Sequence, residues 1–244
     1  MRPVRESRAP VSGTIVALGG GGFSMSEDGR SAIDDHILEL TGVDRPRVCF
    51  VPTASGDSAD YRRRFEEAFA GRAETSVLSL FGSPPHGYRD PTVLLEQDVI
   101  YVGGGSTANL LAVWRLHGLS AILREAAQAG VVLAGISAGM NCWFDQSSTD
   151  SFGPLAPLRD GLGLLAGSAC PHYLGEPGRR DQYLEWVRTG ELADGYAVDD
   201  FTALIFQDGA LADAVAERAA RTAFAVRRDG DGVIEDPIEV RELV

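Results

Sequence analysis

The sequence predicts an α/β fold: a mostly parallel sheet flanked by helices, with antiparallel hairpins at the C-terminal end. Three observations predict it. From Gly13 on, short runs rich in β-branched residues alternate with longer amphipathic stretches. Glycine clusters follow several of the short runs. After Ala203, Asp-Gly pairs separate apolar runs, as they do in antiparallel hairpins.

The first part of the chain alternates five strands with helices. We expect strands at 14–18, 47–53, 75–80, 98–102 and 131–134, and helices at 32–40, 58–70, 107–116 and 118–129. The pattern changes after about Gly161. There we expect a strand at 167–173 and a helix at 181–189, followed by hairpin turns at Asp208-Gly209 and at 229–232. Such an alternation is typical of a parallel sheet wrapped by helices.

Length and composition limit the function classes. The 244 residues favour one domain, from residue 13 to 244, and residues 1–12 lack the apolar stretch of a signal peptide, so a flexible tail is expected there. No apolar run approaches the ~18 residues that a membrane span needs. The net charge of −13 would repel a phosphate backbone. Membrane insertion and nucleic-acid binding are therefore not expected.

The cysteines point to a reducing compartment. Cys49, Cys142 and Cys170 are odd in number and widely spaced in apolar surroundings, which fits reduced thiols better than disulfides or a metal site. We therefore expect a cytoplasmic protein without a metal ion or cofactor. The sequence leaves open whether the protein forms a homodimer.

Glycine is over-represented, with 29 of 244 residues against a usual ~7%. Three clusters, at 19–22, at 103–105 and at Gly135 with Gly139, follow predicted strands. The carboxyl ends of parallel strands are where ligands bind in such sheets. The first cluster does not match Gly-x-Gly-x-x-Gly in register, and no acid for a ribose follows the second strand, so a tight turn is favoured there over a nucleotide site.

The third cluster predicts a nucleophilic serine. The segment 135–139, Gly-Ile-Ser-Ala-Gly, matches Gly-x-Ser-x-Gly, the motif of a nucleophile elbow, directly after a buried strand and before a helix candidate at 140–144. The sharp turn from strand to helix tolerates only very small flanking residues and exposes the hydroxyl of Ser137. The helix N-terminus adds a positive dipole, and the Ala138 N–H can face an oxyanion.

A catalytic serine needs a base, and the chain has only four histidines. His36 and His117 lie on or beside predicted helices, and His86 lies in a loop without a partner pattern. His172 comes at the end of a predicted strand, at the sheet edge where catalytic groups gather. We therefore expect His172 to be the base.

The third member of a triad is a carboxylate that fixes the histidine tautomer. The candidates are Asp145, Asp150, Asp160 and Glu176. Asp150 leads because it lies in a polar turn after the elbow helix, whereas Asp160 precedes a glycine in an ordinary turn.

The second glycine cluster can contribute to an oxyanion hole. Because 103–105 ends the strand before the elbow unit, its backbone N–H groups could complement that of Ala138. A simple turn is the alternative for this cluster.

These residues together resemble the peptidase E family of serine dipeptidases, relatives of cyanophycinase with a class-I glutamine-amidotransferase-like sheet. The matching segments are 101–107 (Tyr-Val-Gly-Gly-Gly-Ser-Thr), 135–141 (Gly-Ile-Ser-Ala-Gly-Met-Asn) and 171–173 (Pro-His-Tyr). They occur in the family's order at about its spacing, and the resemblance covers most of the chain. It implies hydrolysis of dipeptides or short peptides with an N-terminal aspartate.

The resemblance also implies roles for individual residues. Ser137 would be the nucleophile and His172 the base, with the oxyanion held by Gly104 or Gly105 together with Ala138. Asp150 is the nearest match to the family's acid, at slightly shorter spacing, while Glu176 stays open because some relatives use a glutamate. Arg180 stands where the family has the arginine that recognises aspartate, and an arginine fork suits a carboxylate. Ser106 is expected on the substrate side.

Other functions fit less well. In α/β-hydrolase esterases the histidine usually lies far downstream, whereas here it follows the serine by 35 residues. A glutamine amidotransferase would need a cysteine at position 137. A non-catalytic protein of the same fold that binds a peptide or small molecule remains an alternative, although the serine and histidine argue against it.

Overall fold

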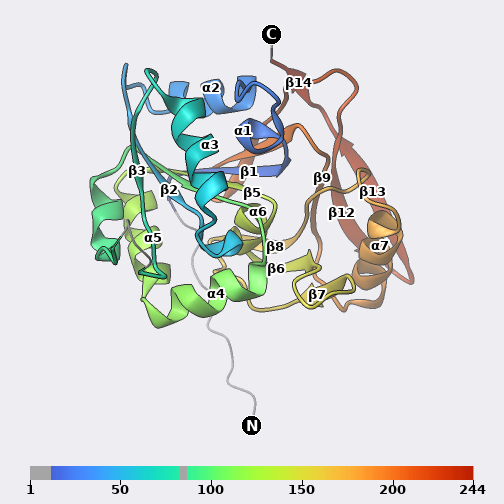
Figure 1. Ribbon diagram of the computed structural model, residues 1–244. Coiled ribbons are helices and arrows are strands. Elements are labelled where there is room, and N and C mark those ends of the chain that lie inside the picture. Colours follow the sequence, from blue (N-terminus) through green and yellow to red (C-terminus); the bar gives the residue numbers. More distant parts are fainter. Residues whose placement is uncertain (1–11, 83–86, 244) are drawn as a thin grey trace.

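The computed structural model describes residues 12–82 and 87–243 and contains two β-sheets (Figure 1). The larger sheet has the order β14-β11-β10-β1-β5-β4-β2-β3. Its strands are β1 (Thr14–Gly20), β2 (Arg47–Val51), β3 (Glu74–Val77), β4 (Val99–Val102), β5 (Val132–Ile136), β10 (Thr202–Gln207), β11 (Ala210–Ala216) and β14 (Arg241–Glu242). The strands from β1 to β3 in this order run parallel, and β10 pairs antiparallel with β1.

Helices cover both faces of the larger sheet (Figure 1). On β1, Val16 and Leu18 pack in one apolar cluster, whereas Ile15 and Ala17 pack in the other. The first cluster includes residues of α2 (Ala32–Glu39) and α3 (Ala59–Phe69), next to the short α1 (Gly22–Met25). The second includes residues of α4 (Thr107–Leu116), α5 (Leu119–Gln128) and α6 (Ala138–Trp143). Burial of both strand faces explains the continuous apolar runs in the sequence.

The smaller sheet has the order β13-β12-β9-β8-β6-β7. Its strands are β6 (Phe144–Thr149), β7 (Ala156–Leu158), β8 (Leu165–Cys170), β9 (Gly195–Val198), β12 (Ala223–Asp229) and β13 (Gly232–Ile238). Helix α7 (Arg179–Thr189) packs on it through Tyr183 and Val187. Two 3₁₀ helices, η1 (Thr53–Ser55) and η2 (Pro91–Glu96), complete the described elements. Residues of both sheets, such as Leu133 and Ala169, share one apolar cluster, so the sheets pack against each other.

The predicted fold class is confirmed, and the structure adds a second sheet that the sequence did not predict. The expected strands and helices up to residue 134 all occur, although β3 ends at Val77 instead of continuing to residue 80. The Asp208-Gly209 turn joins β10 to β11, and the turn at 229–232 joins β12 to β13. Residues 1–11 of the expected tail lie outside the described residues, and so does His86. No helix in the described ranges is long and apolar enough to span a membrane.

Candidate active site

Ser137 lies in a strained turn between β5 and α6. Its backbone has φ 56° and ψ −109°, a conformation that costs free energy in a residue with a Cβ. The two flanking glycines make the turn possible. A Cβ on Gly135 would lie 2.4 Å from the carbonyl oxygen of Gly139, and one on Gly139 would lie 2.4 Å from that of Val102. The elbow therefore has the geometry that the Gly-x-Ser-x-Gly segment predicts, with α6 beginning two residues earlier than expected.

His172 follows β8 of the smaller sheet and reaches Ser137 of the larger one. Its Nε2 lies 2.9 Å from Ser137 Oγ, within hydrogen-bond distance. The backbone N–H of His172 donates to the carbonyl oxygen of Gly19, which ties the end of β8 to the end of β1. His172 also has a positive φ, 52°. The structure thus brings together the two side chains that the sequence indicates as nucleophile and base.

The carboxylate next to His172 is Asp200, not Asp150. Asp200 Oδ1 lies 2.5 Å from His172 Nδ1, so Nδ1 carries a proton that the carboxylate accepts, and Nε2 is free to accept the proton of Ser137. Asp200 stands in the connection from β9 to β10, where the chain passes from the smaller sheet to the larger. His172 and Asp200 are 18% and 17% exposed, so the pair is open to a substrate but mostly shielded from water.

The expectation for Asp150 is wrong in position, and Glu176 does not reach the imidazole either. Asp150 lies in the turn after β6 with 62% of its side chain exposed, and its contact is Arg179, at 3.8 Å. Glu176 accepts from Arg179 Nε at 2.8 Å. The physical reason is the path of the chain: β9 returns the backbone to His172 only at Asp200, 28 positions further along, and no local pattern marks that return.

Glycines leave the space that Asp200 occupies: a Cβ on Gly175 would lie 2.4 Å from Asp200 Oδ2, and Gly20 is closer still. A Cβ on Gly20 would lie 2.1 Å from Asp200 Oδ1 and 3.0 Å from His172 Cε1. Part of the first glycine cluster therefore leaves room for two side chains of this site. The sequence favours a tight turn for this cluster, and the structure adds that Gly20 makes space for Asp200 and His172.

Each residue of the glycine loop, Gly103–Gly105, faces a different neighbour. A Cβ on Gly103 would lie 2.9 Å from the ring of Tyr61, and one on Gly105 would lie 2.3 Å from the carbonyl oxygen of Ala54. The same position on Gly104 is 3.4 Å from the Cβ of Ser137. The loop therefore passes directly beside the serine, as the sequence predicts.

The amide groups near Ser137 differ in their partners. The Gly104 N–H donates to Tyr61 Oη at 3.2 Å, so this amide, one of the expected oxyanion donors, already has an acceptor. Within the described ranges, no acceptor is found for the N–H groups of Gly105 and Ala138. The hydroxyl of Ser106 accepts from Asn109 N and caps α4, which is a structural role.

The two arginines at the start of α7 lie in different surroundings. Arg180 donates to Glu235 of β13 at 2.5 and 3.1 Å, and Tyr173 donates to the same carboxylate at 2.7 Å. Arg179 is 4% exposed and binds Glu176. Its charge also acts on Cys170, two residues before His172. Both arginines therefore contact the chain around His172: the charge of Arg179 acts on Cys170, and Arg180 shares Glu235 with Tyr173.

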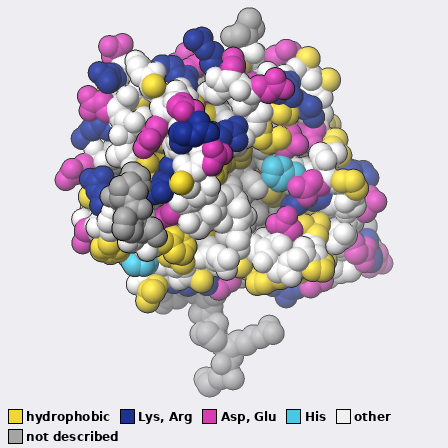
Figure 2. All heavy atoms as spheres, viewed as in Figure 1, with side chains coloured by type: hydrophobic (Ala, Val, Ile, Leu, Met, Phe, Trp, Pro, Cys, Tyr) yellow, Lys and Arg dark blue, Asp and Glu magenta, His cyan; other side chains and the backbone are white. Residues whose placement is uncertain are grey.

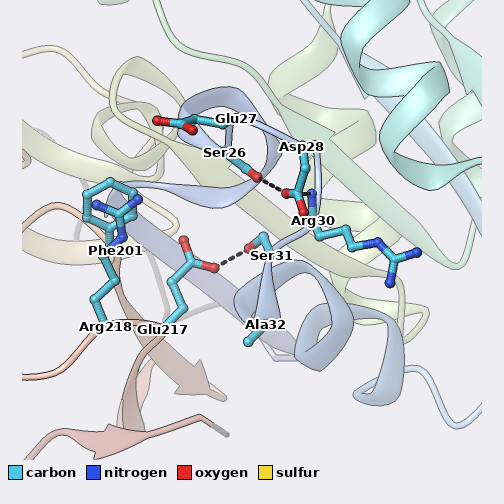
Figure 3. A pocket seen from close by; sticks show the side chains of 9 residues that line it. All are labelled: Ser26, Glu27, Asp28, Arg30, Ser31, Ala32, Phe201, Glu217 and Arg218. Carbon is cyan, nitrogen blue, oxygen red and sulfur yellow. Dashed lines mark hydrogen bonds between the residues drawn. The ribbon is translucent and has the colours of Figure 1, made fainter.

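A cavity of about 560 Å³ opens beside Phe201, the residue after Asp200 (Figure 3). Its other lining residues are Ser26, Glu27, Asp28, Arg30, Ser31, Ala32, Glu217 and Arg218. Figure 3 shows the guanidinium of Arg218 lying on the ring of Phe201, 3.4 Å from its centroid. Glu217 accepts from Ser31 Oγ and from the N–H of Gly22. These contacts fix the segment after β1 and leave Glu217 occupied.

The buried thiols are unsuited to nucleophilic chemistry. All three cysteines are free and buried, as expected. Burial raises the pKa of Cys49 to about 11 and that of Cys170 to about 12, and it raises the pKa of Cys142 well above its usual range. A protonated thiol is a poor nucleophile. Histidine side chains, unlike these thiols, reach the surface on the face of the molecule that Figure 2 draws, and acidic side chains lie beside one of them.

The chain is similar in sequence and in fold to known peptidases. The model of peptidase family S51 matches residues 15–213. The uncharacterized peptidase YgaJ of Bacillus subtilis (strain 168) is 47% identical over 230 residues, which cover 94% of this chain and 98% of that protein. Peptidase E of Pasteurella multocida (strain Pm70) is 29% identical over 186 residues, 72% and 76% of the two chains. The crystal structure of a peptidase from an acI-B1 Actinobacterium superposes with a TM-score of 0.68 at 17% identity, covering 95% and 98%, and shares the fold.

Proposed function

The chain belongs to peptidase family S51, and from this premise we propose that it is a serine-type peptidase that cleaves dipeptides or short peptides through an acyl-enzyme. A single observation carries the serine mechanism: His172 lies between the hydroxyl of Ser137 and the carboxylate of Asp200, at 2.9 and 2.5 Å. This is the arrangement that general-base activation of a serine requires.

The first half of the reaction forms an ester. His172 Nε2 takes the proton of Ser137 Oγ as that oxygen attacks the carbonyl carbon after the first residue of the peptide. The negative charge on the carbonyl oxygen would be held by the N–H groups of Gly105 and Ala138. When the tetrahedral intermediate collapses, His172 gives its proton to the leaving amine, and the acyl group stays on Ser137.

The second half releases the acyl group. Water enters where the amine left, His172 accepts one of its protons, and the resulting hydroxide attacks the ester. Collapse returns the proton to Ser137 Oγ and frees the amino acid. Asp200 keeps Nδ1 of His172 protonated and stabilises the imidazolium in both halves, so all proton transfers pass through His172.

We further propose a preference for an acidic first residue. The resemblance to peptidase E supports it, and a buried arginine near the site supplies the chemistry. Arg179 carries a planar fork that suits a carboxylate, and its present partners, Glu176 and Asp150, are 48% and 62% exposed and able to move. A substrate carboxylate would then replace one of these acids.

A dipeptide library assayed on the wild-type protein and on Ser137→Ala tests the proposal. We expect release of free amino acids from Asp-X dipeptides by the wild type and none by Ser137→Ala, with equal unfolding temperatures for the two. Equal activity in both proteins would exclude Ser137 as the nucleophile. Cleavage of simple esters alone would favour an esterase, and binding of dipeptides without turnover would favour a non-catalytic protein.

A further inference from the structure

Two of the three glycines in the loop beside Ser137 contact α3. Tyr61, on the first turn of that helix, packs its ring against the Cα of Gly103, where a Cβ would lie 2.9 Å from the ring. Its hydroxyl oxygen accepts the N–H of Gly104 at 3.2 Å. One side chain thus contacts two consecutive residues of the glycine loop.

Tyr61 is itself fixed in place. Its ring lies 5.0 Å from that of Phe50 and 5.4 Å from that of Phe23, within a cluster of buried aromatic residues. Burial raises the pKa of Tyr61 above its usual range, so the hydroxyl remains neutral. A rigid, neutral phenol is a suitable acceptor for a backbone amide.

The opposite side of the loop is held by backbone contacts. Ser106 N donates to the carbonyl oxygen of Ala54 at 2.8 Å, and Gly103 N donates to that of Val51 at 3.2 Å. Between these two contacts, the N–H of Gly104 is the one backbone amide of the described loop with a hydrogen-bond partner, and that partner is Tyr61. The hydroxyl of Tyr61 therefore determines which way the Gly104 amide points.

We propose that Tyr61 is a positioning residue for the oxyanion hole: by accepting the Gly104 N–H, it turns that amide away from Ser137 and presents the next one, that of Gly105, to the substrate's carbonyl oxygen. This inference rests on the proposed serine mechanism. It assigns the two oxyanion donors to Gly105 and Ala138 and gives α3 a part in the reaction. Donors aimed beforehand at a developing charge need no reorganisation in the transition state, which is the source of their effect.

The test compares two variants that each remove one buried hydroxyl and keep the ring. Tyr61→Phe removes the acceptor of Gly104. Tyr101→Phe is the matched control, because Tyr101 belongs to the same aromatic cluster but its hydroxyl donates to Asp34 at 2.9 Å. Unfolding temperatures of both variants show whether the fold is retained.

Two readouts are measured on each protein: kcat and KM for a dipeptide, and the rate at which a fluorophosphonate phosphonylates Ser137. The phosphonyl oxygen occupies the oxyanion hole, so this second rate needs no peptide turnover. For Tyr61→Phe we expect both kcat and the phosphonylation rate to fall roughly tenfold, with KM within about twofold. For Tyr101→Phe we expect both rates to stay within about twofold of wild type.

The possible results separate the two proposals. Equal losses in both variants, or no loss in Tyr61→Phe, would overturn the role of Tyr61. A faster Tyr61→Phe enzyme would also overturn it, because Tyr61 would then compete for an amide that the oxyanion needs. If wild type is phosphonylated at Ser137 but cleaves no peptide, the peptidase proposal fails alone and the phosphonylation rates still decide on Tyr61. If Ser137 is not phosphonylated at all, both proposals fail.

Discussion

Asp200 accepts a hydrogen bond at 2.5 Å from His172, which lies 28 positions earlier in the chain. His172 follows β8 and Asp200 follows β9, two strands of the smaller sheet. Their side chains contact each other beside Gly20, at the end of β1. The contact links the histidine to the point at which the chain enters the larger sheet.

This contact predicts that Asp200→Asn lowers kcat by roughly three to four orders of magnitude with little change in KM, because the imidazole loses its tautomer and its countercharge. Asp150→Asn is the matched control and should keep kcat within about fivefold of wild type. Steady-state kinetics on an Asp-X dipeptide measures both. A large loss in Asp150→Asn beside a small one in Asp200→Asn would restore Asp150 as the acid.

A second prediction concerns the crowding at Gly105. Both Gly105 and Gly56 have positive φ, 135° and 66°, but a Cβ on Gly105 would lie 2.3 Å from Ala54 O, whereas none lies within 4 Å at Gly56. Gly56→Ala should therefore cost about 1 kcal/mol of unfolding free energy through backbone strain alone. Gly105→Ala should cost roughly 3 kcal/mol. Urea unfolding measures both, and equal costs would show that the loop can move away from Ala54.

Asp34 gives a prediction for pH. Burial raises the pKa of this carboxyl to about 7, and it accepts from Phe23 N at 2.7 Å and from Tyr101. In the unfolded chain it ionises near pH 4, so unfolding releases a proton at intermediate pH. The free energy of unfolding should therefore fall as pH rises from about 4 to about 7, by roughly 4 kcal/mol at most, and the loss is complete above that range.

Asp34→Asn removes this titration. Urea unfolding of wild type and of the variant between pH 4.5 and 8 compares the two. We expect the difference in unfolding free energy to shift in favour of Asp34→Asn as pH rises. Parallel curves would show that Asp34 is ionised in the folded protein throughout.

The two arginines of α7 give a prediction for specificity. Arg179→Gln should raise KM for Asp-Leu at least tenfold and change KM for Ala-Leu little, because a charged partner of the substrate carboxylate is lost. Arg180→Gln should leave both KM values within about threefold, since that guanidinium is already paired with both oxygens of Glu235. Equal increases for both substrates in Arg179→Gln would remove Arg179 from recognition of the acidic residue.

The sequence predicted those features that depend on neighbours in the chain. Ser137 stands in a five-residue motif after an apolar strand, and His172 follows a strand of its own, so each could be recognised locally. Asp200 and Tyr61 reach the site only through the packing of β9 and α3 beside β1 and β4. Neither carries a pattern of its own, and the sequence therefore predicts an acid too close to the serine.

The smaller sheet shows a second limit. Strand β6 reads as a polar segment, yet Ser147, Ser148 and Thr149 are at most 2% exposed. Small hydroxyl side chains fit into a buried strand without the apolar alternation that predicts one. The region after Gly161 was recognised as different, but its pairing into a six-stranded sheet depends on long-range contacts.

The three residues of the proposed triad are divided between the two sheets: Ser137 follows a strand of the larger one, His172 follows a strand of the smaller one, and Asp200 lies in the connection between them. Catalytic turnover therefore depends on the correct packing of the two sheets against each other. Partial unfolding that separates the two sheets would abolish activity while most helices and parallel strands persist. On heating, the loss of activity would therefore precede the loss of the far-ultraviolet circular dichroism signal.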